Sequence, residues 1–131
     1  MRYLVCVVVG VLIGAMCALT AASVLAARHP WPRAVMTVMQ HEFGAARDGV
    51  RAGRCSDADV ASASAHLKLL SADIEPALLA PGAHDRVFSQ YAEDLRREIA
   101  AFAAPGGDCV ARAEAVTKIG HACDACHRDY K

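Results

Sequence analysis

The sequence has no excess of charge of either sign, with 14 basic and 14 acidic side chains among 131 residues. Removal of the first 27 residues would take away only Arg2 among the charged side chains, so the balance would hardly change. A domain that binds nucleic acid normally carries a clear basic excess on one face. The composition therefore predicts no nucleic-acid partner.

The chain also lacks the alternation of apolar and polar residues that marks a half-buried strand, and it has no internal repeat. Apolar residues instead recur every three or four positions, which is the period of an amphipathic helix. Helices are expected within residues 28–54, 56–71 and 84–103, and from residue 108 into the C-terminal motif. Short connections make successive helices antiparallel, so the predicted fold is all-α, an up-down-up-down four-helix bundle.

Local signals support these helix boundaries. Pro32 suits a first helical turn, Gly53 suits a C-terminal stop, and Ser56 suits an N-cap with the acid Asp59 in the following turn. The residues expected to face inward are Val35, Met36, Met39, Phe43, Ala46 and Val50 in the first helix, Val87, Phe88, Tyr91, Leu95, Ile99 and Phe102 in the third, and Val110, Ala113, Val116, Ile119 and Gly120 in the fourth.

Residues 5–27 contain no charged side chain and follow a single early cation, Arg2. Small residues at Ala22, Ala26 and Ala27 resemble the exit of a secretory signal. The prediction is a signal peptide over residues 1–27 and one domain over residues 28–131. An uncleaved membrane anchor is the alternative, because about 20 apolar residues span a bilayer.

Four of the six cysteines lie outside this N-terminal segment, and two of them stand in Cys123-Asp124-Ala125-Cys126-His127. This C-x-x-C-H pattern is typical of c-type haem attachment. On a helix, residues three and four apart share one face, so both thiols and the imidazole can reach one flat macrocycle. Cys123 and Cys126 are predicted to bind a covalent haem c, with His127 as an axial iron ligand.

Two other interpretations of the cysteines remain open. A redox dithiol of the thioredoxin kind would place C-x-x-C in a βαβ context, which this helical sequence lacks. Half of a structural zinc site would need a second ligand pair, and Cys55 and Cys109 stand alone in the sequence.

The second axial ligand follows from topology. The beginning of the first helix lies beside the end of the fourth in such a bundle, which brings Met36 opposite His127. Met/His ligation is known in cytochromes and raises the reduction potential. The alternatives are that Met36 is an ordinary core residue, or that Met39, His41 or His121 takes this place.

At these residues the chain resembles the cytochrome c′ family of haem proteins of the bacterial periplasm. "IGHACDACHRDYK" is similar to the family's closing motif, and "RAVMTVMQHEF" looks like the opening helix that carries the distal haem residue. The resemblance implies a low-spin, methionine-ligated subgroup through Met36, a propionate partner in Arg128 or Lys131, and a homodimer formed by the first two helices.

Of the remaining cysteines, Cys55 falls in the connection between the first two predicted helices, and Cys109 lies just after the connection between the last two. Both connections belong to the same end of the predicted bundle, away from the haem. A disulfide between them is therefore expected, with two separate thiols as the alternative.

The leading function is a periplasmic one-electron carrier that performs no enzymatic reaction and whose redox partner the sequence does not identify. The alternative is a five-coordinate haem protein that binds nitric oxide or another small gas. An enzyme that uses Cys123 and Cys126 as a dithiol is a third hypothesis. Contact with a membrane is expected only if residues 1–27 are retained.

Overall fold

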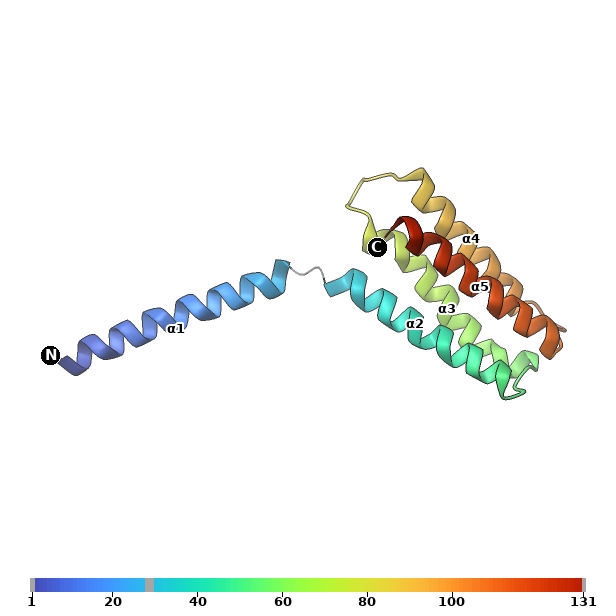
Figure 1. Ribbon diagram of the computed structural model, residues 1–131, viewed down its shortest axis with the longest axis horizontal. Coiled ribbons are helices and arrows are strands. Elements are labelled where there is room, and N and C mark those ends of the chain that lie inside the picture. The colour runs from blue at the N-terminus through green and yellow to red at the C-terminus, as the bar shows by residue number, and fades with distance from the viewer. Residues whose placement is uncertain (1, 28–29, 131) are drawn as a thin grey trace. The chain divides into compact units, whose positions relative to one another are not determined.

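The computed structural model describes residues 2–27 and 30–130, and every regular element in these ranges is a helix (Figure 1). The helices are α1 (Arg2–Ala27), α2 (Pro30–Arg51), α3 (Asp57–Leu78), α4 (Arg86–Ala103) and α5 (Cys109–Asp129). The chain divides between Pro30 and Trp31 into two units. The predicted boundary at residue 28 lies outside the described residues. The all-α fold class is confirmed.

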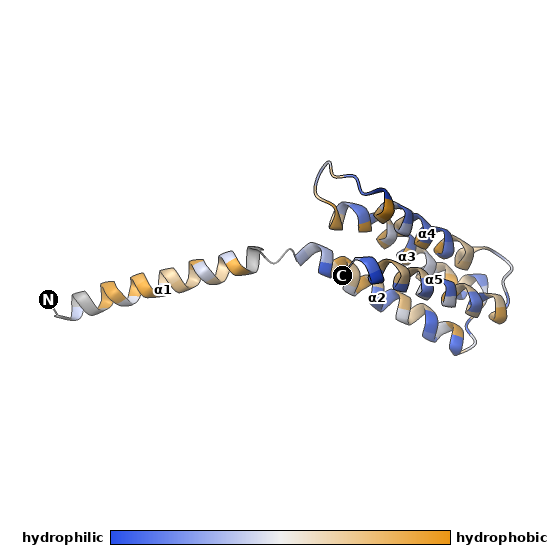
Figure 2. Cartoon of the chain, turned by 45° about the horizontal axis from the view of Figure 1, so that its top comes forward, coloured by the Kyte–Doolittle hydropathy of each residue, from blue (hydrophilic) through white to orange (hydrophobic). Residues whose placement is uncertain are grey.

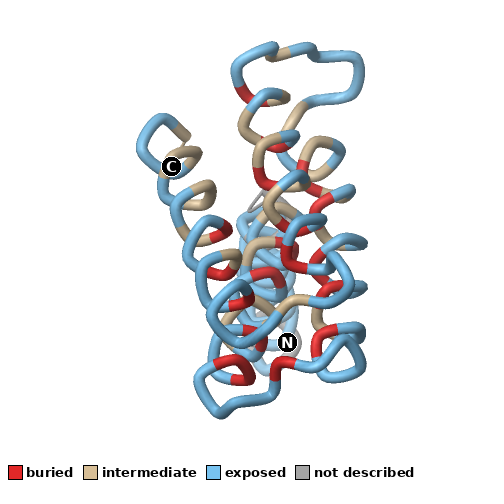
Figure 3. Tube along the Cα trace, turned by 90° about the vertical axis from the view of Figure 1, so that its right-hand side faces the viewer, coloured by how far each residue is buried: buried red, intermediate tan, exposed pale blue. Residues whose placement is uncertain are grey.

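The first unit contains the apolar helix α1, which has no continuous polar face (Figure 2). Its segment Val7–Val24 is long and apolar enough to cross a membrane, and the side chains of that segment are exposed (Figure 3). Such an N-terminal helix is compatible with a signal sequence, and by length alone it is equally compatible with an anchor.

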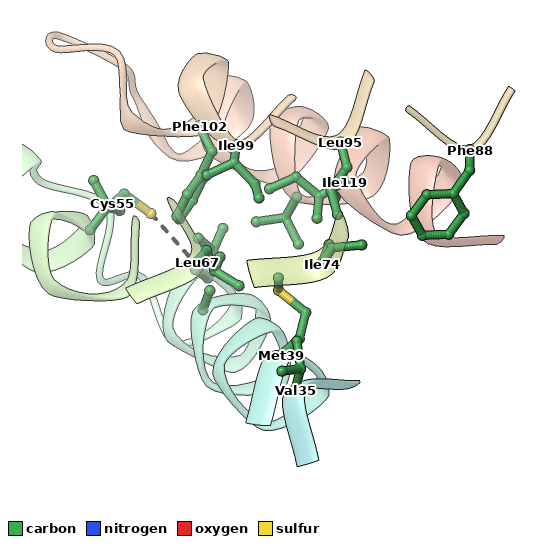
Figure 4. Packing of buried hydrophobic residues seen from close by; sticks show 14 residues of the cluster. Val35, Met39, Cys55, Leu67, Ile74, Phe88, Leu95, Ile99, Phe102 and Ile119 are labelled. Carbon is green, nitrogen blue, oxygen red and sulfur yellow. Dashed lines mark hydrogen bonds between the residues drawn. The ribbon is translucent and has the colours of Figure 1, made fainter. Parts of the chain in front are cut away.

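The second unit is a helical bundle in which α2, α3, α4 and α5 run in alternating directions and are joined by short connections (Figure 1). Helix α4 packs closely along both α3 and α5. Buried positions recur along each helix of this unit (red in Figure 3). Their side chains form one core cluster that includes Val116 and, as labelled in Figure 4, Val35, Met39, Leu67, Ile74, Phe88, Leu95, Ile99, Phe102 and Ile119.

Side chains at the helix starts explain where three of these helices begin. Ser56 and Asp59 form a capping box at α3, in which the Ser56 hydroxyl accepts from the Asp59 N–H at 3.2 Å and the Ser56 N–H donates to Asp59 Oδ2 at 3.1 Å. Asp85 caps α4 and Asp108 caps α5. The N-cap predicted at Ser56 is confirmed.

The second predicted helix was expected to end near Ser71, and this boundary is wrong because α3 continues to Leu78. Its buried face follows Ser64, Leu67, Ser71 and Ile74 at helical spacing. The two buried hydroxyls donate to carbonyls three residues earlier, from Ser64 to Ala61 at 3.0 Å and from Ser71 to Lys68 at 2.8 Å. Because these serines are satisfied locally, they can occupy core positions that a hydropathy pattern does not reveal.

Three residues predicted to face inward are exposed: Val87, Val110 and Ala113. The buried face of α4 begins at Phe88, so Val87 points about 100° away from it. The buried face of α5 instead runs through Arg112, Val116 and Ile119. A charged side chain thus occupies the inward position that the sequence pattern assigned to its neighbours.

Candidate cofactor-binding site

A cavity of about 320 Å³ lies among α2, α3, α4 and α5, and its wall includes Met36, Cys123, Cys126 and His127. These are the four residues that the sequence predicted to hold a haem and its iron. The rest of the wall is mostly apolar, from Met39, Phe43, Ile74, Phe88, Ala92 and Leu95, with the polar groups Gln40, Tyr91 and Asp124. Cavities that bind cofactors are usually of this size and apolar character.

Helix α5 places the cysteine motif on the cavity because positions 123, 126 and 127 are three and four residues apart. The thiols of Cys123 and Cys126 are half-buried, and the His127 side chain is exposed. Helix α2 brings Met36 to the same wall from a part of the chain about 90 residues earlier. The alternating direction of the helices therefore brings Met36 of α2 and the motif of α5 to the same cavity.

Both thiols of the motif are held in their neutral form. Burial, with smaller effects from the Asp124 and Cys126 side chains, raises the pKa of Cys123 to about 11. Burial, followed by the charge of Asp129, raises the pKa of Cys126. A nucleophilic dithiol normally has a lowered pKa, so these surroundings argue against thioredoxin-like chemistry.

Cys55 and Cys109 lie at the opposite end of the bundle, where the structure joins them in a disulfide with a Cα–Cα distance of 5.1 Å. They are therefore not available as a second ligand pair for zinc bound at Cys123 and Cys126. Within residues 2–27 and 30–130, no group of three or more His, Cys, Asp and Glu side chains converges on one point.

The two methionines of α2 differ in their surroundings. Met39 is 5% exposed and points from α2 into the core cluster with Leu67 and Ile74 (Figure 4). Met36 is half-buried and packs against the edge of that cluster, so less of its side chain is enclosed by core residues. His41 and His121 are exposed and lie outside the wall of the cavity. Met36 is thus the better placed of these candidates for a ligand.

A second cavity, of about 400 Å³, shares Phe43, Cys123 and Asp124 with the first and lies between α2 and α5. Cys123 therefore borders open space on both sides. The donor set fits a c-type haem: two adjacent neutral thiols can form thioethers with two vinyl groups, and an imidazole and a thioether can bind iron.

Two further polar residues of the first cavity were not found from the sequence. Gln40 lies one turn after Met36 on α2, and Tyr91 comes from the second turn of α4. The sequence pattern predicts Tyr91 only as part of an apolar stripe, because nothing in its spacing indicates that it reaches the C-terminal motif. Of the two expected propionate partners, Arg128 is exposed at the end of α5 and Lys131 lies outside the described residues.

No family model, curated protein or solved structure matches this chain.

Proposed function

We propose that this chain is a periplasmic c-type cytochrome of the cytochrome c′ kind, which carries one electron at a time on a covalently bound haem. The observation that carries the proposal is the convergence of Met36 with Cys123, Cys126 and His127 on one largely apolar cavity. The C-x-x-C-H motif alone predicts attachment, and the methionine from α2 supplies the second iron ligand that the motif lacks.

In this proposal each residue has a distinct role. Cys123 and Cys126 hold the haem through thioethers, and His127 and Met36 bind its iron from two different helices. The bound haem supplies reversible one-electron chemistry. The mostly apolar wall would limit the access of water to a bound haem, and a soft, neutral thioether ligand from Met36 would favour the reduced form and so raise the reduction potential.

The proposed compartment follows from the N-terminal helix and the disulfide. Helix α1 is compatible with a signal sequence, and a disulfide between Cys55 and Cys109 suits the oxidising periplasm. If α1 is retained, the domain is tethered to a membrane instead.

A second candidate function is favoured by the surroundings of Met36. Its side chain is half-buried at the edge of the core, and Met39 and Phe43 of α2 add further apolar surface to the same cavity. Without Met36 as a ligand, a bound haem iron would be five-coordinate, and its open position could take a small neutral gas such as nitric oxide. The protein would then be a gas-binding module.

The absorption spectrum of the full chain, produced in a host with a c-type haem maturation system, tests the proposal. We expect a low-spin spectrum with a ferric methionine-to-iron charge-transfer band. Met36→Leu should convert it to a high-spin spectrum, because leucine offers no ligand atom. The matched control is Met39→Leu, a substitution of similar volume at a buried position, which should leave the spectrum low-spin.

The outcomes separate the candidates. A colourless protein would overturn the cytochrome proposal. A high-spin wild type would favour the gas-binding module. A low-spin spectrum that persists in Met36→Leu but is lost in Met39→Leu would identify Met39, one turn further along α2, as the axial ligand in place of Met36.

A further inference from the structure

The last turn of α5 carries Cys126 and His127, although helix ends are the parts of a helix that fray most readily. The final backbone bond of this turn runs from the N–H of Tyr130 to the carbonyl of Cys126 at 2.9 Å. Any movement of Tyr130 therefore acts directly on the backbone of the cysteine. Contacts that hold Tyr130 in place consequently also help to hold Cys126 and His127 in their orientation.

Two tyrosine–aspartate hydrogen bonds join this turn to α4. The Tyr91 hydroxyl donates to Asp129 Oδ2 at 2.6 Å, and the Tyr130 hydroxyl donates to Asp85 Oδ2 at 2.8 Å. The other carboxylate oxygen of Asp85 accepts the N–H groups of Val87 and Phe88, both at 3.0 Å. Asp85 thus caps the start of α4 and receives the end of α5 at the same time.

The aromatic rings connect these bonds to the cavity. The Tyr130 ring packs edge-to-face against Phe88 at 5.1 Å between ring centroids and against Tyr91 at 6.2 Å. Phe88 and Tyr91 are themselves part of the cavity wall, together with Cys126 and His127. Phe88 and Tyr91 therefore contact the end of α5 through Tyr130 and also form part of the wall of the cavity that Cys126 and His127 line.

We propose that Tyr91 and Tyr130 are positioning residues, which hold the last turn of α5 against α4 so that Cys126 and His127 face the cavity. Tyr91, Tyr130 and their acceptors Asp129 and Asp85 form what we name the tyrosine clamp. This role depends on the proposed function, because the residues that the clamp directs are those that would hold the haem.

The protonation states suit such a clamp near neutral pH. The hydrogen bond to Asp85, with a smaller effect of burial, raises the pKa of Tyr130 to about 12. The hydrogen bond to Asp129 raises the pKa of Tyr91 in the same way. Hydrogen bonds from the N–H of Phe88 and from Tyr130 lower the pKa of Asp85, so the phenols stay protonated while this acceptor stays charged.

The experiment compares the purified full chain, produced in the maturation-competent host, with Tyr91→Phe, Tyr130→Phe and the double variant. Hydrogen–deuterium exchange of the segment 126–130 should be about threefold to tenfold faster in each single variant, and faster again in the double variant. In an acid titration, the double variant should lose its low-spin spectrum at a higher pH than the wild type, because a poorly directed imidazole is protonated more easily.

Two control variants separate positioning from general destabilisation. Ser89→Ala removes a 2.7 Å hydrogen bond from α4 to Glu75 of α3 but does not touch α5, so both readouts should match the wild type. Asp129→Asn removes a charge but keeps an oxygen that accepts from Tyr91, so it should resemble the wild type more than Tyr91→Phe.

Unchanged exchange in the double variant would overturn the clamp. Faster exchange with an unchanged titration would overturn its role in positioning His127. A colourless protein with faster exchange in the double variant would instead overturn the proposed function, since exchange reports the clamp whether or not a haem is attached.

Discussion

Arg112 is a charged side chain that the bundle buries almost completely, with 2% of its surface exposed. Its guanidinium donates to Asp57 Oδ1 at 2.6 Å and to the carbonyl of Phe102. Among the described residues, its Nε has no hydrogen-bond partner. This atom lies 2.9 Å from where a Cβ on Gly107 would be, so glycine leaves the room that the Arg112 side chain occupies. Asp57 is more than half exposed. If the ion pair is broken, water can therefore solvate the Asp57 carboxylate but not the buried Arg112 guanidinium.

That difference predicts an asymmetry between two substitutions. Asp57→Ala leaves a buried cation without its counter-charge and also removes the acceptor for the N–H of Gly106, so it should lower the free energy of unfolding by about 3 kcal/mol. Arg112→Leu leaves an exposed carboxylate, which water solvates, and one buried carbonyl, so it should cost about 1–2 kcal/mol. Urea unfolding of both variants measures the two values.

A larger loss of stability in Arg112→Leu than in Asp57→Ala would contradict this prediction. It would mean that Asp57 does not stabilise the fold mainly by neutralising the buried charge of Arg112. Ser62→Ala, at an exposed position of α3, serves as a control for the purification and should unfold at the same urea concentration as the wild type.

Most residues of the candidate site could be predicted from the sequence alone. Cys123, Cys126 and His127 could be found because the motif and the helical period place them on one face. Met36 could be found because alternating helix directions bring the start of α2 near the end of α5. Tyr91 could not be found, since only the packing of α4 against α5 brings its hydroxyl 2.6 Å from Asp129.

Among the contacts between helices, the one centred on Glu75 links α3 to α4. Glu75 accepts from the Ser89 hydroxyl at 2.7 Å and from the Arg96 guanidinium at 3.0 Å. The hydrogen bond from Ser89 is the main reason that the pKa of Glu75 lies below its ordinary value of 4.5, with a further contribution from Arg96. The carboxylate therefore stabilises the folded state only while it is ionised.

This contact predicts a particular pH dependence. Because the folded pKa is lowered, the contribution of Glu75 is fully present above pH 4.5 and is lost as the pH falls through the folded value. Glu75→Gln removes this contribution, so the stability difference from the wild type should be largest near neutral pH and should shrink in acid. Urea unfolding between pH 3 and 7 measures it, with Glu93→Gln, at an exposed position of α4, as the control. A difference that stays constant with pH would contradict this assignment.

The sequence predicts where the helices begin better than it predicts where they end or which of their residues are buried. Ser56 marks α3 because its hydroxyl and the Asp59 carboxylate satisfy free N–H groups, and such local bonds are readable in a sequence. The end of α3 could not be read, because Pro76 looks like a break although it stands in the last turn of the helix. The inward position of Arg112 could not be read either, since its partner Asp57 is 55 residues away in sequence.

In the bundle as a whole, the two features that constrain the chain lie at opposite ends. The disulfide joins the connection before α3 to the first residue of α5, whereas the candidate haem site and the tyrosine clamp lie at the other end. The covalent bond limits the unfolded chain, and the aromatic contacts and cavity wall shape only the folded one. Loss of the disulfide should therefore lower the free energy of unfolding without changing the geometry of the candidate haem site.

The double substitution Cys55→Ala and Cys109→Ala tests this independence. The bond closes a loop over a sequence separation of 54 residues, so its removal should lower the free energy of unfolding by up to about 4 kcal/mol in the loop-entropy model. The unfolded chain also becomes more expanded, so the dependence of unfolding on urea should be steeper than in the wild type. The absorption spectrum should not change.

The matched comparison is the wild type and the double variant in the same thiol reductant, which removes the bond from the wild type without a substitution and gives the iron the same oxidation state in both. The two proteins should then unfold at the same urea concentration. Agreement of these two midpoints, with the spectrum unaltered, would mean that the bond acts on the unfolded chain. A spectral change in the double variant would instead mean that strain passes along α5 from Cys109 to Cys123, so that the two ends of the bundle are coupled after all.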